Sequence, residues 1–335
     1  NTYISNQKLS FPFKKLNISA QSLNKNSKIQ IESDLIDGFI EGNMSLIEIP
    51  GNVLNTFNTY LGVSNITKIQ SDNHFSFKAD IHLPKEFVDI FIPELTVLEI
   101  SQFNGKYSSL NNSLLLNMDI PKLVYSSIEL DSFQLELNGH NTELQLDLLI
   151  DEIRYDTLNI QNIGIKQKLN FGELLSEFSI SDSLNNPSYL FANVIVIKDD
   201  YLKVKFLPEG LILDGKTWKV DTSNYFENNK GLVFAQNAKC TFENQLLQLT
   251  IADGYPKISF TNFGIENITN IVTSEKTKKI IRGNINGEII LPNRQKPDYF
   301  ETTIAISNLS FIDIPVGDLE LNFKSDNDDI SLSST

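Results

Sequence analysis

The stretch that decides the fold class is His74-Phe-Ser-Phe-Lys-Ala-Asp-Ile-His-Leu83. Apolar residues fill every second position, with Phe75, Phe77 and Ile81 in one phase and polar residues between them. Alternation with period two is typical of a strand in a sheet that has one apolar face and one face in water.

The same alternation recurs along the whole chain. Turn-forming pairs separate many of the apolar runs, and the pairs Asn104-Gly105, Asn138-Gly139, Asp214-Gly215 and Asp253-Gly254 are predicted to be tight turns. Strand-like runs follow one another every 10–14 residues or so, which predicts roughly 20–25 strands over the chain. A long antiparallel meander accommodates that number of strands better than one closed sandwich.

Helix content is predicted to be small. The chain of 335 residues has only seven Ala, the best helix former, and it is rich in Asn and Ser, which favour turns. Apolar residues at helical spacing predict three short helices, over residues 52–61, 85–95 and 263–272. The weakest joint lies near residues 182–188 and predicts a division into 1–183 and 184–335, both parts of one continuous element.

Charge and cysteine content exclude several classes of protein. Lys and Arg total 28 against 42 Asp and Glu, a net charge of −14. A nucleic-acid partner is therefore not expected, because phosphate binding needs a basic surface. The single Cys excludes an internal disulfide framework and any site with several Cys ligands. No apolar run is long enough to span a membrane as a helix.

Catalytic and metal-binding constellations are not found. His74 and His82 are eight positions apart on one predicted strand, roughly 27 Å, so they cannot share a metal ion. Cys240 is interpreted as a half-buried strand thiol, and the acidic run at residues 326–329 as a solvated turn. We therefore predict a non-enzymatic protein with no metal and no cofactor.

Two phrases of the sequence resemble a known family. The first runs from Phe206 through Gly215 to Trp218-Lys-Val-Asp and an Asn-led turn, and the second is Ile306-Ser-Asn-Leu-Ser-Phe-Ile-Asp-Ile-Pro-Val-Gly317-Asp-Leu-Glu-Leu321. Both are similar to phrases of the TamB family, the translocation and assembly module in its Bacteroidetes form, which is related to AsmA-like and bridge-like lipid-transfer proteins. The phrases cover about a tenth of the chain.

The resemblance implies an elongated, curved antiparallel β-groove (a β-taco) with an apolar concave face and a few short helices. It implies a periplasm-spanning protein that carries phospholipid between the inner and outer membranes and supports outer-membrane assembly. The implied partners are phospholipids, an outer-membrane barrel of the TamA/BamA type, and the inner membrane through an anchor outside this chain. The chain would then be an internal fragment of a longer protein.

The alternating sets give the side chains expected to line such a groove. Trp218 is expected to be a structural anchor at a strand end, with direct lipid contact as the alternative, and Gly317 marks the second phrase. The expected lining residues are Phe75, Phe77, Ile81, Leu135, Leu137, Leu144, Leu146, Leu148, Val204, Phe206, Leu247, Leu249, Ile251, Ile304, Ile306, Leu319, Leu321 and Phe323.

Two other functions compete with the lipid conduit. A structural or adhesive sandwich or solenoid array of the cell surface would use the same residues as a dry core. A glycan-binding or glycan-cleaving protein would need convergent carboxylates and exposed aromatic clusters, and the single Trp makes it the weakest of the three.

Overall fold

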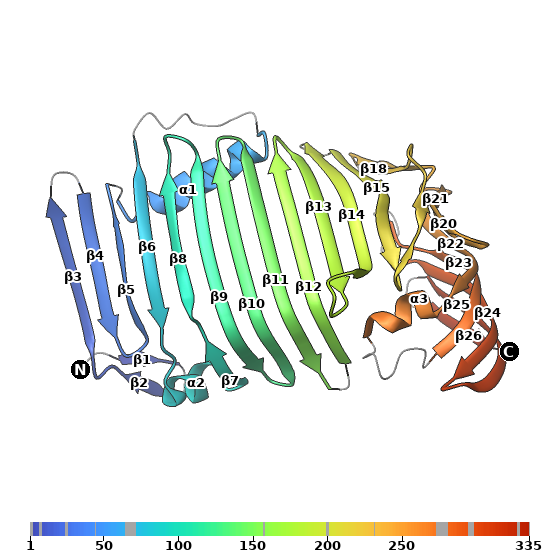
Figure 1. Ribbon diagram of the computed structural model, residues 1–335, viewed down its shortest axis with the longest axis horizontal. Coiled ribbons are helices and arrows are strands. Elements are labelled where there is room, and N and C mark those ends of the chain that lie inside the picture. The colour runs from blue at the N-terminus through green and yellow to red at the C-terminus, as the bar shows by residue number, and fades with distance from the viewer. Residues whose placement is uncertain are drawn as a thin grey trace. The chain divides into compact units, whose positions relative to one another are not determined.

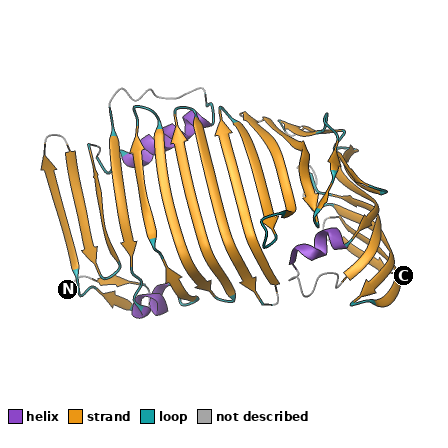
Figure 2. Ribbon diagram, in the orientation of Figure 1, coloured by secondary structure: helices purple, strands orange, loops and turns teal. Residues whose placement is uncertain are grey.

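The computed structural model describes residues 3–6, 9–23, 26–43, 45–63, 72–156, 158–198, 201–230, 232–272, 281–293, 298–326 and 329–334. Contacts divide the chain into two compact units. The first unit comprises residues 1–157 and 161–172, and the second comprises 158–160 and 173–335. The earlier expected division at 183/184 falls inside the second unit. The prediction of an all-β, antiparallel protein is confirmed, with twenty-six strands in the described residues (Figures 1 and 2).

The first unit is built on one antiparallel sheet. Its strand order is β3-β4-β5-β6-β8-β9-β10-β11-β12, with β7 also paired to β9 and with β1 and β2 as a separate pair. The bounds are β1 Tyr3–Ser5, β2 Ser10–Pro12, β3 Leu16–Leu23, β4 Asn26–Ser33, β5 Ile36–Gly42, β6 His74–Ile81, β7 Leu95–Glu99, β8 Gln102–Ser108, β9 Ser113–Tyr125, β10 Ile128–His140, β11 Glu143–Tyr155 and β12 Leu158–Asn170.

Strand register gathers the alternating apolar residues of the first unit on one face. Residues directly opposite one another in an antiparallel pair lie on the same face of the sheet. Five strands are joined in this way by the chain of pairs Phe77–Gly105–Leu116–Leu137–Leu146. The intervening residues, such as Lys78, Glu136 and Gln145, are exposed, as the alternation predicts.

Helix α1, Ile49–Tyr60, covers one end of this apolar face (Figure 1). Its Tyr60 is fully buried against Leu137 and Leu144, and its Val53 packs against the Phe75–Tyr107 cluster. The helix predicted at 52–61 is confirmed with a start three residues earlier, since Pro50 occupies a first-turn position that suits proline.

The helix predicted at 85–95 is shorter than expected. Helix α2 is Lys85–Phe91, and strand β7 begins at Leu95. No helix in the described residues is long and apolar enough to cross a membrane.

Two of the four predicted turns are wrong. Asn104-Gly105 lies inside β8 and Asn138-Gly139 inside β10. A side chain at Gly105 would collide with the ring of Phe77, and one at Gly139 with the hydroxyl of Tyr60. These glycines therefore make room for aromatic side chains on the apolar face. Asp214-Gly215 and Asp253-Gly254 are turns, with positive φ at all four residues.

The alternation of β10 and β12 changes phase within the strand. In β10 the apolar series steps from Leu130 to Phe133, and in β12 from Ile160 to Ile163. Between them lie Ser132 with φ +57° and Asn162 with φ +51°. A residue in the left-handed region turns the strand locally, so the alternation restarts one position later.

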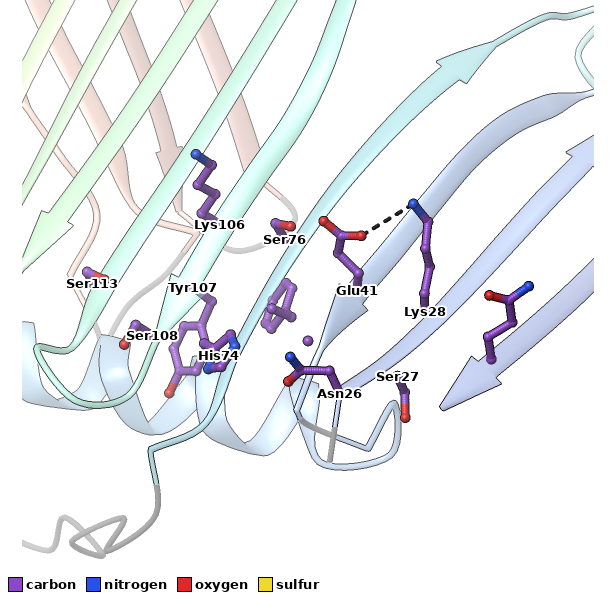
Figure 3. A pocket seen from close by; sticks show the side chains of 13 residues that line it. Asn26, Ser27, Lys28, Glu41, His74, Ser76, Lys106, Tyr107, Ser108 and Ser113 are labelled. Carbon is purple, nitrogen blue, oxygen red and sulfur yellow. Dashed lines mark ion pairs between the residues drawn. The ribbon is translucent and has the colours of Figure 1, made fainter. Parts of the chain in front are cut away.

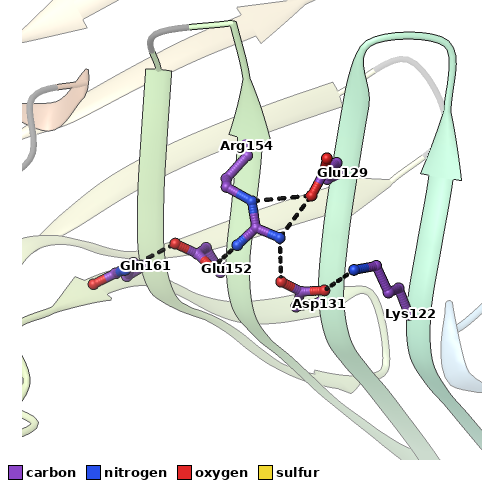
Figure 4. Close-up of polar contacts among 6 residues, drawn as sticks. All are labelled: Lys122, Glu129, Asp131, Glu152, Arg154 and Gln161. Atoms are coloured by element: carbon purple, nitrogen blue, oxygen red, sulfur yellow. Dashed lines mark hydrogen bonds and ion pairs between the residues drawn. The ribbon is translucent and has the colours of Figure 1, made fainter.

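An ion-pair cluster lies next to this phase change (Figure 4). Arg154 Nη2 donates to a carboxylate oxygen of Glu129 at 2.7 Å and of Asp131 at 2.6 Å, and Arg154 also pairs with Glu152. Hydrogen bonds to Glu129 and then to Asp131 raise the pKa of Arg154. Three carboxylates on adjacent strands β10 and β11 are thus held together by one guanidinium group.

The second unit contains strands in two sets. In the first, β13-β14-β15-β18-β19 pair in that order, and β16 pairs with β15. In the second, the order is β17-β20-β21-β22-β23-β24-β25-β26. The bounds are β13 Glu173–Ser181, β14 Pro187–Lys198, β15 Tyr201–Leu213, β16 Lys216–Thr217, β17 Lys219–Val220, β18 Tyr225–Asn229, β19 Leu232–Gln236, β20 Lys239–Phe242, β21 Gln245–Ala252, β22 Tyr255–Gly264, β23 Ile281–Ile290, β24 Phe300–Phe311, β25 Ile314–Asp326 and β26 Asp329–Ser334.

The third predicted helix is only partly confirmed. Residues 263–264 still belong to β22, and the helical part consists of α3, Glu266–Thr269, followed by a 3-10 turn at Asn270–Val272. Apolar spacing of three and four residues cannot tell a short helix from the end of a strand.

Candidate functional site: an apolar cavity in the second unit

The two sets of strands in the second unit each present an apolar face. In the first set, Val204 of β15 lies opposite Ile195 of β14 and Phe226 of β18. In the second set, Leu247 of β21 lies between Cys240 of β20 and Phe260 of β22.

These faces line a half-open cavity of about 390 Å³. Its lining is almost wholly apolar, and the volume lies within the ~300–1,000 Å³ range of small-molecule sites. The lining residues are Phe191, Val204, Phe206, Leu211, Leu213, Val220, Asn224, Tyr225, Phe226, Ala238, Lys239, Cys240, Leu247, Gln248, Leu249, Ile258, Phe260, Phe263 and Ile268. We call this space the apolar cavity.

Helix α3 contributes Ile268 to the lining and is fixed by polar contacts. Lys216 Nζ donates to Asn267 Oδ1 at 3.1 Å, and Asn267 Nδ2 donates to Gln245 Oε1 at 2.8 Å. Asn270 Nδ2 donates to Asp214 Oδ1 at 2.9 Å. These bonds tie α3 to β16 and β21 and tie the following 3-10 turn to the β15–β16 turn, so Ile268 is held at the cavity wall.

Trp218, between β16 and β17, is fully buried beside the cavity. Its ring lies 5.4 Å from that of Phe263 and 6.0 Å from that of Phe242, centroid to centroid. Its indole Nε1 has no hydrogen-bond partner among the described residues. Trp218 is absent from the lining, a placement that fits the predicted strand-end anchor better than direct lipid contact.

Asn224 supports the strand that carries Phe206. Its side chain accepts a hydrogen bond from the Phe206 N–H at 2.9 Å and donates to the Phe206 carbonyl at 2.8 Å. It also donates to the Asp221 carbonyl at 2.6 Å. The amide thus takes the place of strand pairing on the β18 side of β15, where the β15–β18 register ends at Val204 and Phe226.

We expect Asn224→Ala to destabilise the second unit by about 2 to 4 kcal/mol, because two buried backbone groups of Phe206 lose their partner. Urea unfolding followed by fluorescence of the single Trp218 measures this unit directly. Asn229→Ala, at an exposed position on β18, is the matched control and should stay within ~0.5 kcal/mol of wild type. Equal stability of the two variants would contradict this role of Asn224.

Cys240 lies on the cavity wall as a neutral thiol. Burial raises the pKa of this thiol to about 11. Because the thiolate is the reactive form, Cys240 is predicted to be a slow nucleophile at neutral pH. Cys240 is the single cysteine of the sequence and lines the apolar cavity, so a ligand bound in the cavity would cover its thiol.

The expected lining residues divide between the two units. Val204, Phe206, Leu247 and Leu249 meet in the apolar cavity. Strand pairing connects Leu247 by way of Phe260 and Gly287 to Ile304 and Leu321, so these residues lie on one face. Phe323 is connected to Leu249 in the same way and lies on that face too. Further members of the second-unit face outside the cavity are Ile251, Ile306 and Leu319.

In the first unit, the expected lining residues also share one face. The members are Phe75, Phe77, Ile81, Leu135, Leu137, Leu144, Leu146 and Leu148. Phe75, Leu137 and Leu144 are buried, the first against Tyr107 and the others against Tyr60, and the remaining members are half-buried. Contact of any of these residues with lipid stays a prediction.

A second hollow, of about 670 Å³, lies in the first unit, and most of the residues that line it are polar or charged (Figure 3). Its lining includes Asn26, His74 and Lys106, and Lys28 pairs with Glu41 across 3.4 Å. A lining of this kind suits water better than an acyl chain.

Several residues that line the apolar cavity are not among the lining residues expected from the sequence. Ile258-Ser-Phe260 alternates and could have been found by the same rule, whereas Leu211, Val220 and Ile268 lie in short or irregular segments without a readable period. Gly317 is exposed, and a Cβ atom added to it would meet no other atom within 4 Å. Its φ of +111°, which side chains rarely allow, therefore explains the glycine.

In comparisons with known proteins, no protein-family model, curated protein or solved structure matches this chain. Among the described residues, no three His, Cys, Asp or Glu side chains are grouped so that they could hold a metal ion.

Proposed function

We propose that this protein shelters the acyl chains of phospholipids on the apolar faces of its sheets and in the apolar cavity. The observation that carries the proposal is the cavity of about 390 Å³, in which apolar side chains from both sets of strands face a common space. Each methylene group that such a lining shields from water gains about 0.8 kcal/mol. Several methylenes together hold a lipid tail while its headgroup remains in water.

The setting of this activity follows from the TamB resemblance. The chain would be one segment of a periplasmic protein that passes phospholipid between the inner and outer membranes and supports outer-membrane assembly. Its partners would be phospholipid, a barrel of the TamA/BamA type and an inner-membrane anchor. The half-buried apolar face of the first unit supports this view, because a conduit needs a lining that extends beyond one cavity.

Alkylation of Cys240 tests the proposal. We expect the purified chain to carry phospholipid that organic solvent extracts, and its thiol to react slowly near pH 8, where a pKa of about 11 leaves about one thiol in a thousand ionised. Raising the pH toward 11 should speed the reaction. Adding phospholipid to the lipid-depleted chain should slow it further at constant pH, because the ligand covers the cavity wall.

Two results together would overturn the proposal. The purified protein would carry no extractable lipid, and added phospholipid would not change the alkylation rate of Cys240. The structural or adhesive array would then be the better interpretation, with the cavity as a packing defect of a closed core.

A further inference from the structure

Three polar side chains of the second unit meet at α3, the helix that carries Ile268 to the cavity wall. Lys216 of β16 donates from Nζ to Oδ1 of Asn267 in α3 at 3.1 Å. The same Nζ lies 3.6 Å from Oδ2 of Asp214, in the β15–β16 turn. A carboxamide and a carboxylate therefore both lie against one amine, although 51 positions of sequence separate Lys216 from Asn267.

The carboxamide and the carboxylate are each held by a further hydrogen bond. Asn267 Nδ2 donates to Gln245 Oε1 at 2.8 Å, and Asn270 Nδ2 donates to Asp214 Oδ1 at 2.9 Å. Asn267 is only 1% exposed, so water has little access to its carboxamide. The three groups thus have a fixed mutual geometry, which is the condition under which intramolecular reactions gain most in rate.

Aromatic rings border these polar groups. The Lys216 amine lies 6.0 Å from the ring centre of Phe242, and the fully buried Trp218 packs between Phe242 and Phe263. The side chain of Lys216 is 29% exposed and that of Asp214 is 22% exposed. Ionised groups are costly to bury in such surroundings, so a reaction that turns the ammonium–carboxylate pair into neutral groups is favoured.

We infer that Lys216 and Asn267 form an intramolecular isopeptide bond, with Asp214 as the proton relay. Asp214 first takes a proton from the ammonium group of Lys216, which leaves a neutral, nucleophilic amine. Nζ then attacks Cγ of Asn267 and forms a C–N bond, while one proton passes from Nζ through Asp214 to Nδ2 and the bond between Cγ and Nδ2 breaks. The products are an amide, ammonia and a protonated Asp214, so atoms and charge balance without any further reactant.

The isopeptide bond is a covalent staple between β16 and α3. It holds Ile268, the next residue after Asn267, at the wall of the apolar cavity. None of the three reacting residues lines the cavity, so the staple forms whether or not lipid is bound. This inference and the proposed sheltering of acyl chains therefore fail in separate experiments.

The intact mass of the purified, denatured chain tests the inference. We expect a mass that is lower than that of the sequence by one ammonia, and a protease digest that contains a branched peptide joining the side chains of Lys216 and Asn267. A chain with the full mass of its sequence overturns the inference. A deficit located elsewhere overturns it as well, since ring closure at an Asn-Gly pair also releases ammonia.

Lys216→Arg is the decisive variant, because a guanidinium group keeps the charge and the donor but stays protonated and does not attack a carboxamide. We expect this variant to have the full mass of its sequence. Its Tm should be roughly 10 °C lower than that of wild type, because the unfolded chain is no longer constrained by the staple. A mass deficit that persists in Lys216→Arg overturns the inference.

Two further variants complete the test. Asp214→Gly removes the relay and suits the φ of +52° at this position, so a protein that folds by circular dichroism should retain its ammonia. Lys219→Arg, at an exposed position on β17, is the matched control and should keep both the mass deficit and the Tm of wild type. A folded Asp214→Gly protein that still loses ammonia would contradict the role of Asp214.

Discussion

Leu249→Trp is expected to abolish the co-purification of phospholipid while leaving the strands of the second unit intact. Leu249 of β21 lies opposite Ile258 of β22, and both side chains line the apolar cavity. An indole in place of the isobutyl group would occupy space that an acyl chain needs. The cavity already has room for added volume, so the overpacking cost of about 1–3 kcal/mol seen in dense cores should be smaller here. Native mass spectrometry combined with lipid extraction measures the outcome.

Leu232→Trp provides the matched control for that substitution. Leu232 is exposed on β19 and is not part of the cavity lining, so the same change of side chain should leave lipid binding unaltered. Circular dichroism checks that both variants retain the wild-type strand content. Lipid retained at the wild-type level by a folded Leu249→Trp protein would show that the cavity is not the binding site.

Trp218→Ala should cost the second unit about 3–5 kcal/mol of unfolding free energy. The indole is fully buried, and its removal would leave Phe242 and Phe263 facing a void. Transfer of the large side chain and the residual cavity both contribute to a loss of this size. Urea unfolding followed by circular dichroism is the suitable measurement, because the variant lacks the fluorescent residue.

A smaller loss is expected for Trp218→Phe, which keeps an aromatic ring against Phe263. Phe234→Ala, at an exposed position on β19, should change the free energy by no more than ~0.5 kcal/mol. A Trp218→Ala protein as stable as wild type would contradict the view of Trp218 as an anchor.

Faces of the sheets were predictable because alternation is local. Residues that the pattern puts on one face lie opposite one another in neighbouring strands, as Leu135 does with Leu148 and Ile306 with Leu319. Side chains of period two can point only to two sides of a sheet, so one correct phase places every residue of a strand up to a phase change such as those at Ser132 and Asn162.

Features that depend on contacts between residues far apart in the sequence could not be predicted. Gly105 and Gly139 resemble turn glycines in sequence, and only the approach of Phe77 and Tyr60 explains why they stand within strands. The phase changes at Ser132 and Asn162 show in the sequence only as three-residue steps between apolar positions, and the positive φ of these two residues comes from the structure. Enclosure of the apolar cavity depends on which strand sets face each other, which no single segment reveals.

The strand order of the first unit has a kinetic consequence. From β8 to β12, each strand pairs with the next one in sequence, joined in most cases by a turn of a few residues. The loops to be closed are therefore short, and the entropic barrier for adding each strand is low, so this region has a low contact order for a β protein. This sheet can therefore fold strand by strand from its amino-terminal side during synthesis or translocation of the chain. Its folding does not require the strands of the second unit.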